Sequence, residues 1–144
     1  MYDNILIPTD GSQSVGKATE QGLEIAARFG ATVHTLYVVE PVPATDYGGD
    51  QLYDALQSEG ERLMKEMVQE CENLGLEVET DIRSGKPHEA ILDYADEHGI
   101  DLIVMGTHGR TGLDRYLLGS VTEKVVRLSN VPVLTVSIRE ESTD

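Results

Sequence analysis

The sequence predicts a single-domain α/β protein with an open five-stranded parallel sheet and helices on both faces. Three observations lead to this prediction. The chain has 144 residues, 40% of them hydrophobic, which is enough for one compact core. Strand-like and helix-like patterns alternate along it five times, an order typical of parallel sheets with right-handed crossovers. No shift in composition marks a second domain, so we assign residues 1–139 to the domain and 140–144 to a polar tail.

Five short segments have the composition of β-strands. They cover residues 5–7, 31–39, 77–82, 101–105 and 131–138. The fourth segment is an apolar run, as expected for a strand that is covered on both faces. In the third, Val78, Thr80 and Ile82 alternate with acidic residues. This period of two favours a half-exposed strand at an edge of the sheet.

Four segments between these strands predict amphipathic helices. They cover residues 12–29, where Ser12 is the expected N-cap, then residues 52–74, the residues after the turn at 85–87, and residues 121–128. A glycine follows each of the first three helices and is expected to end it. The expected core-facing residues are Val15, Ala18, Gly22, Ile25, Ala26 and Phe29 in the first helix, Leu52, Leu56, Gly60, Leu63, Met67, Cys71 and Leu74 in the second, and Ala90, Ile91, Tyr94 and Ala95 in the third.

A glycine-rich loop follows the fourth predicted strand. It covers residues 106–112 and leads, after six more residues, to Gly119 and Ser120. Ser120 and Glu123 have the spacing of a capping box at the start of a helix. Free N–H groups at a helix N-terminus favour an anion, and glycines let it approach the backbone. The alternative is an ordinary surface loop whose glycines serve only turns.

The distribution of charge agrees with an anion site at this loop. The chain has 11 basic and 26 acidic residues, a net charge of −15. Residues 106–139 nevertheless contain five basic residues and only two acidic ones. The acidic remainder disfavours nucleic acid and anionic membranes as partners, because phosphate repels such a surface. It also suggests a high-salt cytoplasm, the alternative being a merely acidic protein.

Cysteine content and terminal sequence limit the class of protein further. Cys71 is the single cysteine, so an intrachain disulfide and a cysteine-based metal cluster are excluded. The N-terminus lacks the basic region of a signal peptide, and no apolar run reaches membrane length. We therefore expect a soluble, cytoplasmic protein.

Two loops are expected to meet at the carboxyl edge of the sheet, where α/β proteins bind ligands. These are residues 8–12 after the first strand and residues 106–112 after the fourth, which face each other if the two strands are neighbours. The chain contains no G-x-x-x-x-G-K-[ST] motif and no G-x-G-x-x-G after the first strand. It contains instead G-x2-G-x9-G-[ST], formed by Gly106, Gly109, Gly119 and Ser120.

These segments together resemble the universal stress protein family, and in particular its ATP-binding branch. The resemblance covers nearly the whole chain and includes ILIPTDGS at residues 5–12, the GKP turn at 85–87, IVMGTHGRTG at 103–112, LGSVTE at 118–123 and VPVLTV at 131–136. It implies a Rossmann-like fold of the adenine nucleotide alpha hydrolase type. It also implies a small homodimeric regulatory or stress-response module that binds ATP, pairs through its last strand from Val131 to Ile138, and acts on a regulatory partner that the sequence does not identify.

The resemblance also implies the residues of the nucleotide site. Pro8, Thr9, Asp10 and Val38 would line the adenosine part, with Met105 at the end of the fourth strand; Gly106, Thr107, His108, Gly109, Arg110, Thr111 and Gly112 would surround the phosphates; Gly119, Ser120, Val121 and Thr122 would hold the terminal phosphates. Mg²⁺ or Mn²⁺ would accompany the triphosphate, with Asp10 as the nearest carboxylate. Structural alternatives remain open, with Ser120 only as an N-cap, Asp10 as a turn former and His108 as a solvated loop residue.

The reaction class stays open at this stage. The alternative to a regulatory module is a slow ATPase that acts with a partner, and a third possibility is an interaction protein without ATP, which the glycine pattern disfavours. Fast hydrolysis needs a group that orients the attacking water. Asp10 belongs to the adenosine and metal side, Glu123 is expected in the capping box, and His108 has no carboxylate to orient it. We expect no catalytic residue, and His34, His88 and His98 are scattered over different elements and suggest no site.

Overall fold

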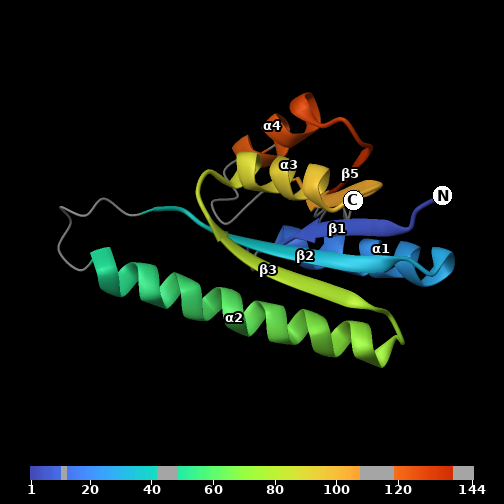
Figure 1. The fold of residues 1–144 in the computed structure, drawn as a ribbon, viewed down its shortest axis with the longest axis horizontal. Coiled ribbons are helices and arrows are strands. Elements are labelled where there is room, and N and C mark those ends of the chain that lie inside the picture. The colour runs from blue at the N-terminus through green and yellow to red at the C-terminus, as the bar shows by residue number, and fades with distance from the viewer. Residues whose placement is uncertain (11–12, 42–48, 108–118, 138–144) are drawn as a thin grey trace, which may run out of the picture.

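In the described part of the chain, five parallel strands form one sheet, and helices cover both of its faces (Figure 1). The computed structural model describes residues 1–10, 13–41, 49–107 and 119–137. Along the chain the elements are β1 (Asn4–Pro8), α1 (Gln13–Phe29), β2 (Thr32–Val39), α2 (Gly49–Asn73), β3 (Val78–Ser84), α3 (Pro87–Glu97), β4 (Leu102–Gly106), α4 (Ser120–Leu128) and β5 (Val133–Val136). The predicted architecture is confirmed, and the bounds of most elements differ from prediction by one to three residues.

The strand order is β3-β2-β1-β4-β5, and every pairing is parallel. β1 is therefore the point at which the order reverses, because β2 lies on one side of it and β4 on the other. Ile5 pairs with Leu102 and Leu6 with Ile103. This confirms that the first and fourth strands are neighbours, and it brings the ends of β1 and β4 together at one edge of the sheet.

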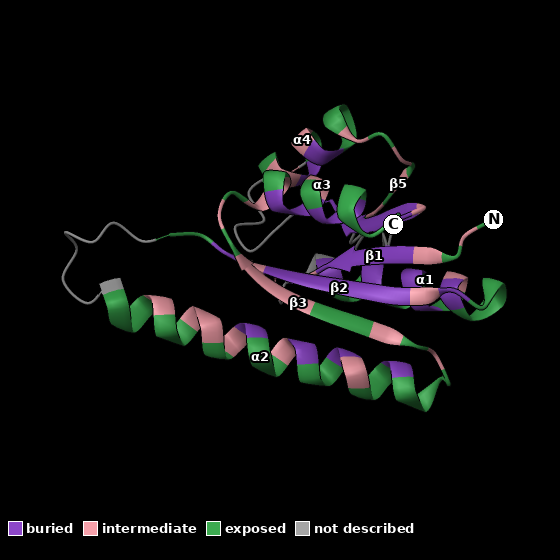
Figure 2. Cartoon of the chain, viewed as in Figure 1, coloured by how far each residue is buried: buried purple, intermediate pink, exposed green. Residues whose placement is uncertain are grey.

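Alternate residues of the central strands supply two separate cores. Ile5 and Ile7 point to the face covered by α1 and α2, whereas Leu6 points to the face covered by α3 and α4. All three are fully buried. Figure 2 shows β1 and β2 buried along most of their length. Each such side chain contributes about 1.5–3 kcal/mol through its removal from water, which explains why apolar runs mark these strands in the sequence.

Both edge strands lie where the sequence suggests. β3 is one edge, and most of its residues are exposed or half-buried, as the alternating pattern predicts. β5 is the other edge and is shorter than predicted, since it covers four residues and Ile138 lies outside the described residues. Leu134 in β5 is 37% exposed. An apolar side chain on an open edge strand is a feature that other proteins cover or pair.

The ends of the helices agree only partly with prediction. Gly30, Gly75 and Gly99 follow α1, α2 and α3 with φ of 66°, 69° and 59°, as expected for glycines that end helices. The predicted N-cap Ser12 lies outside the described residues. Leu52 of α2 and Leu74, the residue directly after it, are exposed, so their assignment to the core is wrong, and Met64 is buried instead. Phe29 of α1 is likewise half exposed.

The length of α2 explains the exposure of Leu52, whereas Leu74 lies just after the helix ends. A helix of 25 residues spans about 37 Å. The eight residues of β2, against which it packs, span about 26 Å. The N-terminal end of α2 therefore extends past the sheet, as Figure 1 shows, and a regular apolar stripe continues beyond the surface that could bury it. Cys71 lies in the packed part, where burial raises the pKa of its thiol to about 11.

Gly60 sets how closely α2 approaches the sheet. A Cβ atom at this position would lie 2.5 Å from Cδ1 of Tyr37 on β2. The ring of Tyr37 is buried and packs with Val39 and Met64, so it has little freedom to move aside. By contrast, a Cβ atom on Gly16 in α1 would meet nothing within 4 Å.

A buried polar cluster joins β2 to α3, and no local pattern in the sequence predicts it. The Nδ1 atom of His34 lies 2.7 Å from the Tyr94 hydroxyl, and its Nε2 lies 3.0 Å from Oδ1 of Asn4. The ring of His98 stacks on Tyr94 with a centroid distance of 3.9 Å. His34 and His98 lie on different elements, as the sequence suggests, but the fold brings their rings to a centroid distance of 5.8 Å. They lie far apart in sequence, but α3 packs across β2.

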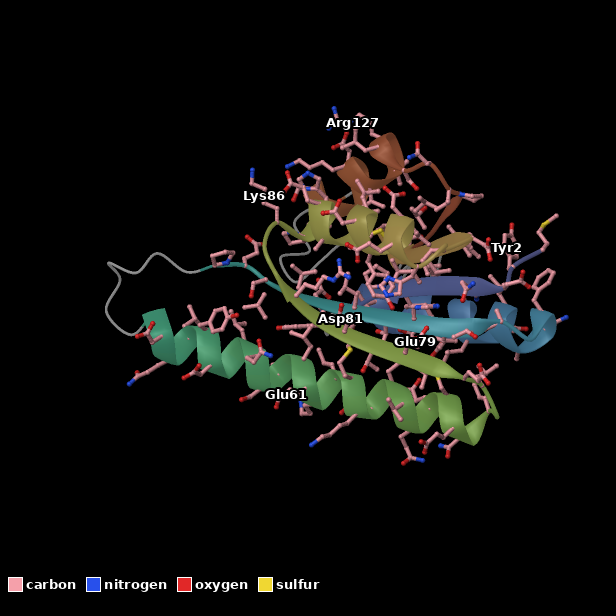
Figure 3. The ribbon with its side chains drawn as sticks, in the orientation of Figure 1. Tyr2, Glu61, Glu79, Asp81, Lys86 and Arg127 are labelled. Carbon is pink, nitrogen blue, oxygen red and sulfur yellow. The ribbon has the colours of Figure 1, made fainter. Side chains whose placement is uncertain are left out.

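Charged groups surround this cluster on two elements. Glu79 on β3 places a carboxylate oxygen 3.5 Å from Nδ1 of His34. Arg83 pairs with Asp81 on β3 and with Glu97 on α3, and lies over the Tyr94 ring. Figure 3 shows Glu79 and Asp81 along β3, with Glu61 on α2 beyond it. Burial lowers the pKa of His34, Glu79 opposes this effect, and His98 adds to it. Burial also raises the pKa of Tyr94 to about 12.

We predict opposite effects on stability for two Gly→Ala substitutions. Gly60→Ala should lower the free energy of unfolding by roughly 1–3 kcal/mol, because the overlap with Tyr37 outweighs the gain in helix propensity. Gly16→Ala should raise it by about 0.5–1 kcal/mol, because only the gain remains. Urea denaturation of both variants measures the difference. A stabilised Gly60→Ala variant would contradict the close packing of α2 on β2.

We also predict that stability falls as the pH decreases below the ordinary His pKa of 6.5. Because the pKa of His34 is lower in the folded chain, its contribution is complete above pH 6.5 and is lost as the pH falls toward the folded-state value. Glu79→Gln removes the group that raises this pKa, so the loss between pH 7.5 and 5.5 should become larger. His34→Gln should reduce it.

Thermal melts at several pH values test this prediction. Glu61→Gln is the matched control, since Glu61 is exposed on α2. It should leave the pH dependence unchanged. The same dependence in wild type, Glu79→Gln and His34→Gln would exclude His34 as its source.

Candidate functional site

A cavity of about 380 Å³ opens at the carboxyl ends of β1, β2 and β4. All four helices contribute to its wall. It is lined by Pro8, Thr9, Asp10, Val15, Leu36, Tyr37, Val38, Val39, Glu40, Leu56, Pro87, Ile91, Met105, Gly106, Gly119, Ser120, Val121 and Thr122. The cavity therefore lies at the position where the strand order reverses, which is where ligands bind in open α/β sheets.

Most of the predicted site residues that the structure describes line this cavity. They are Pro8, Thr9, Asp10, Val38, Met105, Gly106, Gly119, Ser120, Val121 and Thr122. Thr107 is described and buried beside the cavity but does not line it. His108, Gly109, Arg110, Thr111 and Gly112 lie outside the described residues. Two predicted segments distant in sequence, residues 8–10 and 119–122, are thus brought to one cavity.

Backbone hydrogen bonds fix the end of β1 at the cavity. The N–H of Thr9 donates to the carbonyl of Leu36 on β2 at 2.9 Å. The buried hydroxyl of Thr35 donates to the carbonyl of Ile7 at 3.0 Å. These bonds hold the chain in register up to the last residue of the strand. Asp10 lies two residues after the end of β1. The anchored strand therefore fixes its position in the cavity wall.

The N-terminus of α4 forms the opposite wall. Its N-cap is Gly119, whose carbonyl accepts the N–H of Glu123 at 2.9 Å, and no side chain caps the helix. The predicted capping box is therefore wrong. The helix begins one residue earlier than predicted, so Ser120 is its first residue rather than its cap. Glu123 instead pairs with Arg127, Oε1 to Nε at 3.3 Å, and does not line the cavity.

This start leaves the first N–H groups of α4 beside the cavity. In any α-helix these groups have no intrahelical acceptor. Here they belong to the residues after Gly119, and Ser120, Val121 and Thr122 all line the cavity. Together with the helix dipole, they make this wall favourable for an anion.

Two hydrogen bonds tie this helix start to the end of β4. The Thr122 hydroxyl donates to the carbonyl of Gly106 at 2.8 Å and is buried. The N–H of Gly119 donates to the carbonyl of Thr107 at 2.6 Å. In this structure the Thr122 hydroxyl hydrogen therefore holds α4 against β4 and is not directed at the cavity.

The other half of the cavity is mainly apolar, and most of its residues are not among those predicted from the sequence. Val39, Leu56, Pro87 and Ile91 line it beside the predicted Val38. The position of Val39 at the end of β2 is a signal that could have been used. Leu56 carries no such signal, because it is 16 residues from the nearest other lining residue in the chain, Glu40.

Carboxylates at the cavity come from two strand ends, Asp10 after β1 and Glu40 after β2. Among residues 1–10, 13–41, 49–107 and 119–137, no three His, Cys, Asp or Glu side chains are grouped so that they could hold a metal ion. The described part of the chain therefore offers single carboxylates rather than a metal cage.

The sequence from residue 1 to residue 137 matches the universal stress protein family. The chain belongs to this family. Universal stress protein MJ0531 of Methanocaldococcus jannaschii is 37% identical over 140 residues, which cover 94% of this chain and 82% of that protein. The family prediction is confirmed, whereas membership of an ATP-binding branch stays a prediction.

Solved structures of similar proteins share the fold of this universal stress protein. The structure of MJ0577 superposes with a TM-score of 0.83 at 35% identity, and the match covers 98% of this chain and 99% of that one. A universal stress protein in complex with cAMP superposes with a TM-score of 0.74 at 28% identity, covering 94% and 97%. In the described part of this chain, no helix has the length and apolar character required to cross a membrane.

Proposed function

We propose that this universal stress protein binds ATP in the cavity and acts as a nucleotide-dependent regulatory module. The main support for this proposal is that one cavity combines an apolar half with a half that favours anions. One half, between β2, α2 and α3, is apolar and suits a nucleoside. The other half is the N-terminus of α4 beside Gly106 and suits phosphate. The similar protein in complex with cAMP supports an adenine nucleotide as the ligand class.

The roles of the residues follow from the two halves. The adenosine part packs against Pro8, Val38 and Val39. The phosphates lie against the bare backbone of Gly106 and Gly119 and the first N–H groups of α4. Thr122 acts by holding α4 in place through Gly106. The predicted phosphate residues from His108 to Gly112 complete the site in this proposal.

The proposal includes a divalent cation, Mg²⁺ or Mn²⁺, bound with the triphosphate. The donor set fits such a cation, because Mg²⁺ is commonly held by one or two carboxylates together with phosphate oxygens and water. Asp10 would supply the protein ligand. The cation would neutralise charge on the triphosphate, which a chain with a net charge of −15 otherwise repels.

We predict that ATP with Mg²⁺ binds and that Gly119→Val weakens binding by about tenfold or more. Gly119 has φ −59° and ψ 153°, a conformation open to any residue, so the effect comes from side-chain volume in the cavity and not from backbone strain. Gly119→Ala should weaken binding less. Isothermal titration calorimetry measures both affinities.

The control for this titration is Gly16→Ala, which changes a glycine that faces open space. It should bind ATP as wild type does. Wild-type affinity in Gly119→Val would exclude the N-terminus of α4 from the site, and absence of ATP binding in wild type would contradict the proposed function.

We further propose that the chain forms a homodimer through the edge strand β5. This dimer would signal the nucleotide state to a regulatory protein. What supports it is the exposed edge and the exposed side chain of Leu134. We predict a mass of twice 15.8 kDa in solution. Leu134→Glu should reduce it to that of one chain, because a buried carboxylate at the paired edge is costly.

Light scattering at micromolar concentration tests the dimer. Leu74→Glu is the control, since Leu74 is also exposed but lies at the end of α2. It should leave the mass unchanged. A single-chain mass in wild type, or a dimer that persists in Leu134→Glu, would contradict pairing through β5.

A further inference from the structure

One residue of α2, Leu56, belongs to the described lining of the cavity. Its side chain is half-buried and packs against the cluster of Tyr37, Val39 and Met64. Val39, a member of this cluster, also lines the cavity. Leu56 therefore connects the apolar half of the cavity directly to a helix that the predicted site did not include.

The helix α2 is anchored along only part of its length. From Gly60 onward it carries buried residues, among them Met64, Met67 and Cys71. In residues 50–59, no residue is buried. Figure 2 shows the same contrast, with buried positions only in the part of α2 that lies below the sheet. Segments with few buried contacts open at a low free-energy cost.

The described contacts that the first turns of α2 make with the sheet are exposed or half-buried. The Tyr53 hydroxyl lies 2.6 Å from Oγ of Ser84 on β3 in an exposed hydrogen bond. Tyr53 and Leu56 are the side chains of this segment that pack on the cluster around Tyr37. Gly60 marks where the close approach to the sheet begins, because its backbone lies against the Tyr37 ring.

We propose that a nucleoside bound in the cavity packs against Leu56 and thereby orders residues 50–59 of α2. This inference rests on the proposed function. The other parts of the wall have little order to gain, since Val39 and Ile91 are already buried and Thr122 fixes the start of α4. A ligand contact on Leu56 adds burial to the least anchored part of the wall, and binding then shifts the population toward the ordered helix.

As a consequence, the outer surface of residues 50–59 would differ between the occupied and the empty protein. The outer face of these turns carries Asp50 and Asp54, both exposed. A partner that recognises this acidic helical face would distinguish the occupied protein from the empty one. Leu56 is then both a binding residue for the nucleoside and the link between the cavity and this face.

Hydrogen exchange of the full chain with and without ATP and Mg²⁺ tests the inference. Amides of residues 53–59 should exchange roughly tenfold more slowly with ATP, whereas those of residues 64–71 should change little. Leu56→Ala should bind ATP roughly 5- to 20-fold more weakly and should lose the slowing in 53–59. Leu52→Ala is the matched control, because Leu52 is exposed one turn earlier, and it should behave as wild type.

Calorimetry on the same samples separates the possible failures. ATP binding without slower exchange in 53–59 would overturn this inference and leave the proposed function intact. Absence of ATP binding in wild type would overturn both. If ATP still slows exchange of residues 53–59 in Leu56→Ala, the ordering does not depend on Leu56, and the inference is overturned. If Leu56→Ala does not fold, Leu56→Val provides the same comparison with a smaller truncation.

Discussion

The pairing of β1 with both β2 and β4 is the constraint on which the rest of the structure depends. It buries β1 on both faces, separates the two cores, and makes the strand order reverse at its carboxyl end. Because the cavity lies at this reversal, its wall combines segments that are more than 100 residues apart, from Pro8 to Thr122. The hydrogen bonds of Thr9 and Thr122 then fix the two sides of the cavity relative to each other.

The walls of the cavity differ in how firmly they are held. β1, β2 and the start of α4 are fixed by strand pairing and by buried hydrogen bonds. The start of α2 is fixed by partial burial and by the exposed hydrogen bond between Tyr53 and Ser84. A site of this kind combines a rigid half, which defines the geometry for phosphate, with a half that can respond to the ligand. Regulation requires such a difference, because a ligand changes only those parts whose states it binds unequally.

Local patterns in the sequence predicted the architecture well. The apolar run of β4 and the alternation in β3 identified a central and an edge strand, because burial on two faces or one leaves a direct trace in composition. The glycine spacing and the ends of β1 and β4 identified much of the cavity. These features depend on neighbours in the chain or on the general geometry of parallel sheets.

The predictions that proved wrong have a common physical origin. They depend on distances between elements in the folded chain, which no local sequence pattern contains. Periodicity placed Leu52 and Leu74 in the core, because it shows neither how far the sheet extends along α2 nor where the helix ends. The spacing of Ser120 and Glu123 fits a capping box but also a helix that starts one residue earlier. The contacts of His34 with Tyr94 and of Leu56 with the cavity join residues from different elements, and no local pattern encodes them.

The burial of Cys71 has a consequence for the chemistry of this chain. A thiol reacts with peroxides and disulfides as the thiolate, and a pKa of about 11 leaves very little thiolate at neutral pH. The side chain is also fully buried, in the core between α2 and the sheet. The folded protein therefore cannot sense oxidants through its only cysteine. A reagent can modify Cys71 only in molecules in which the anchored part of α2 has separated from the sheet. The rate of modification therefore measures how often this part of the core opens.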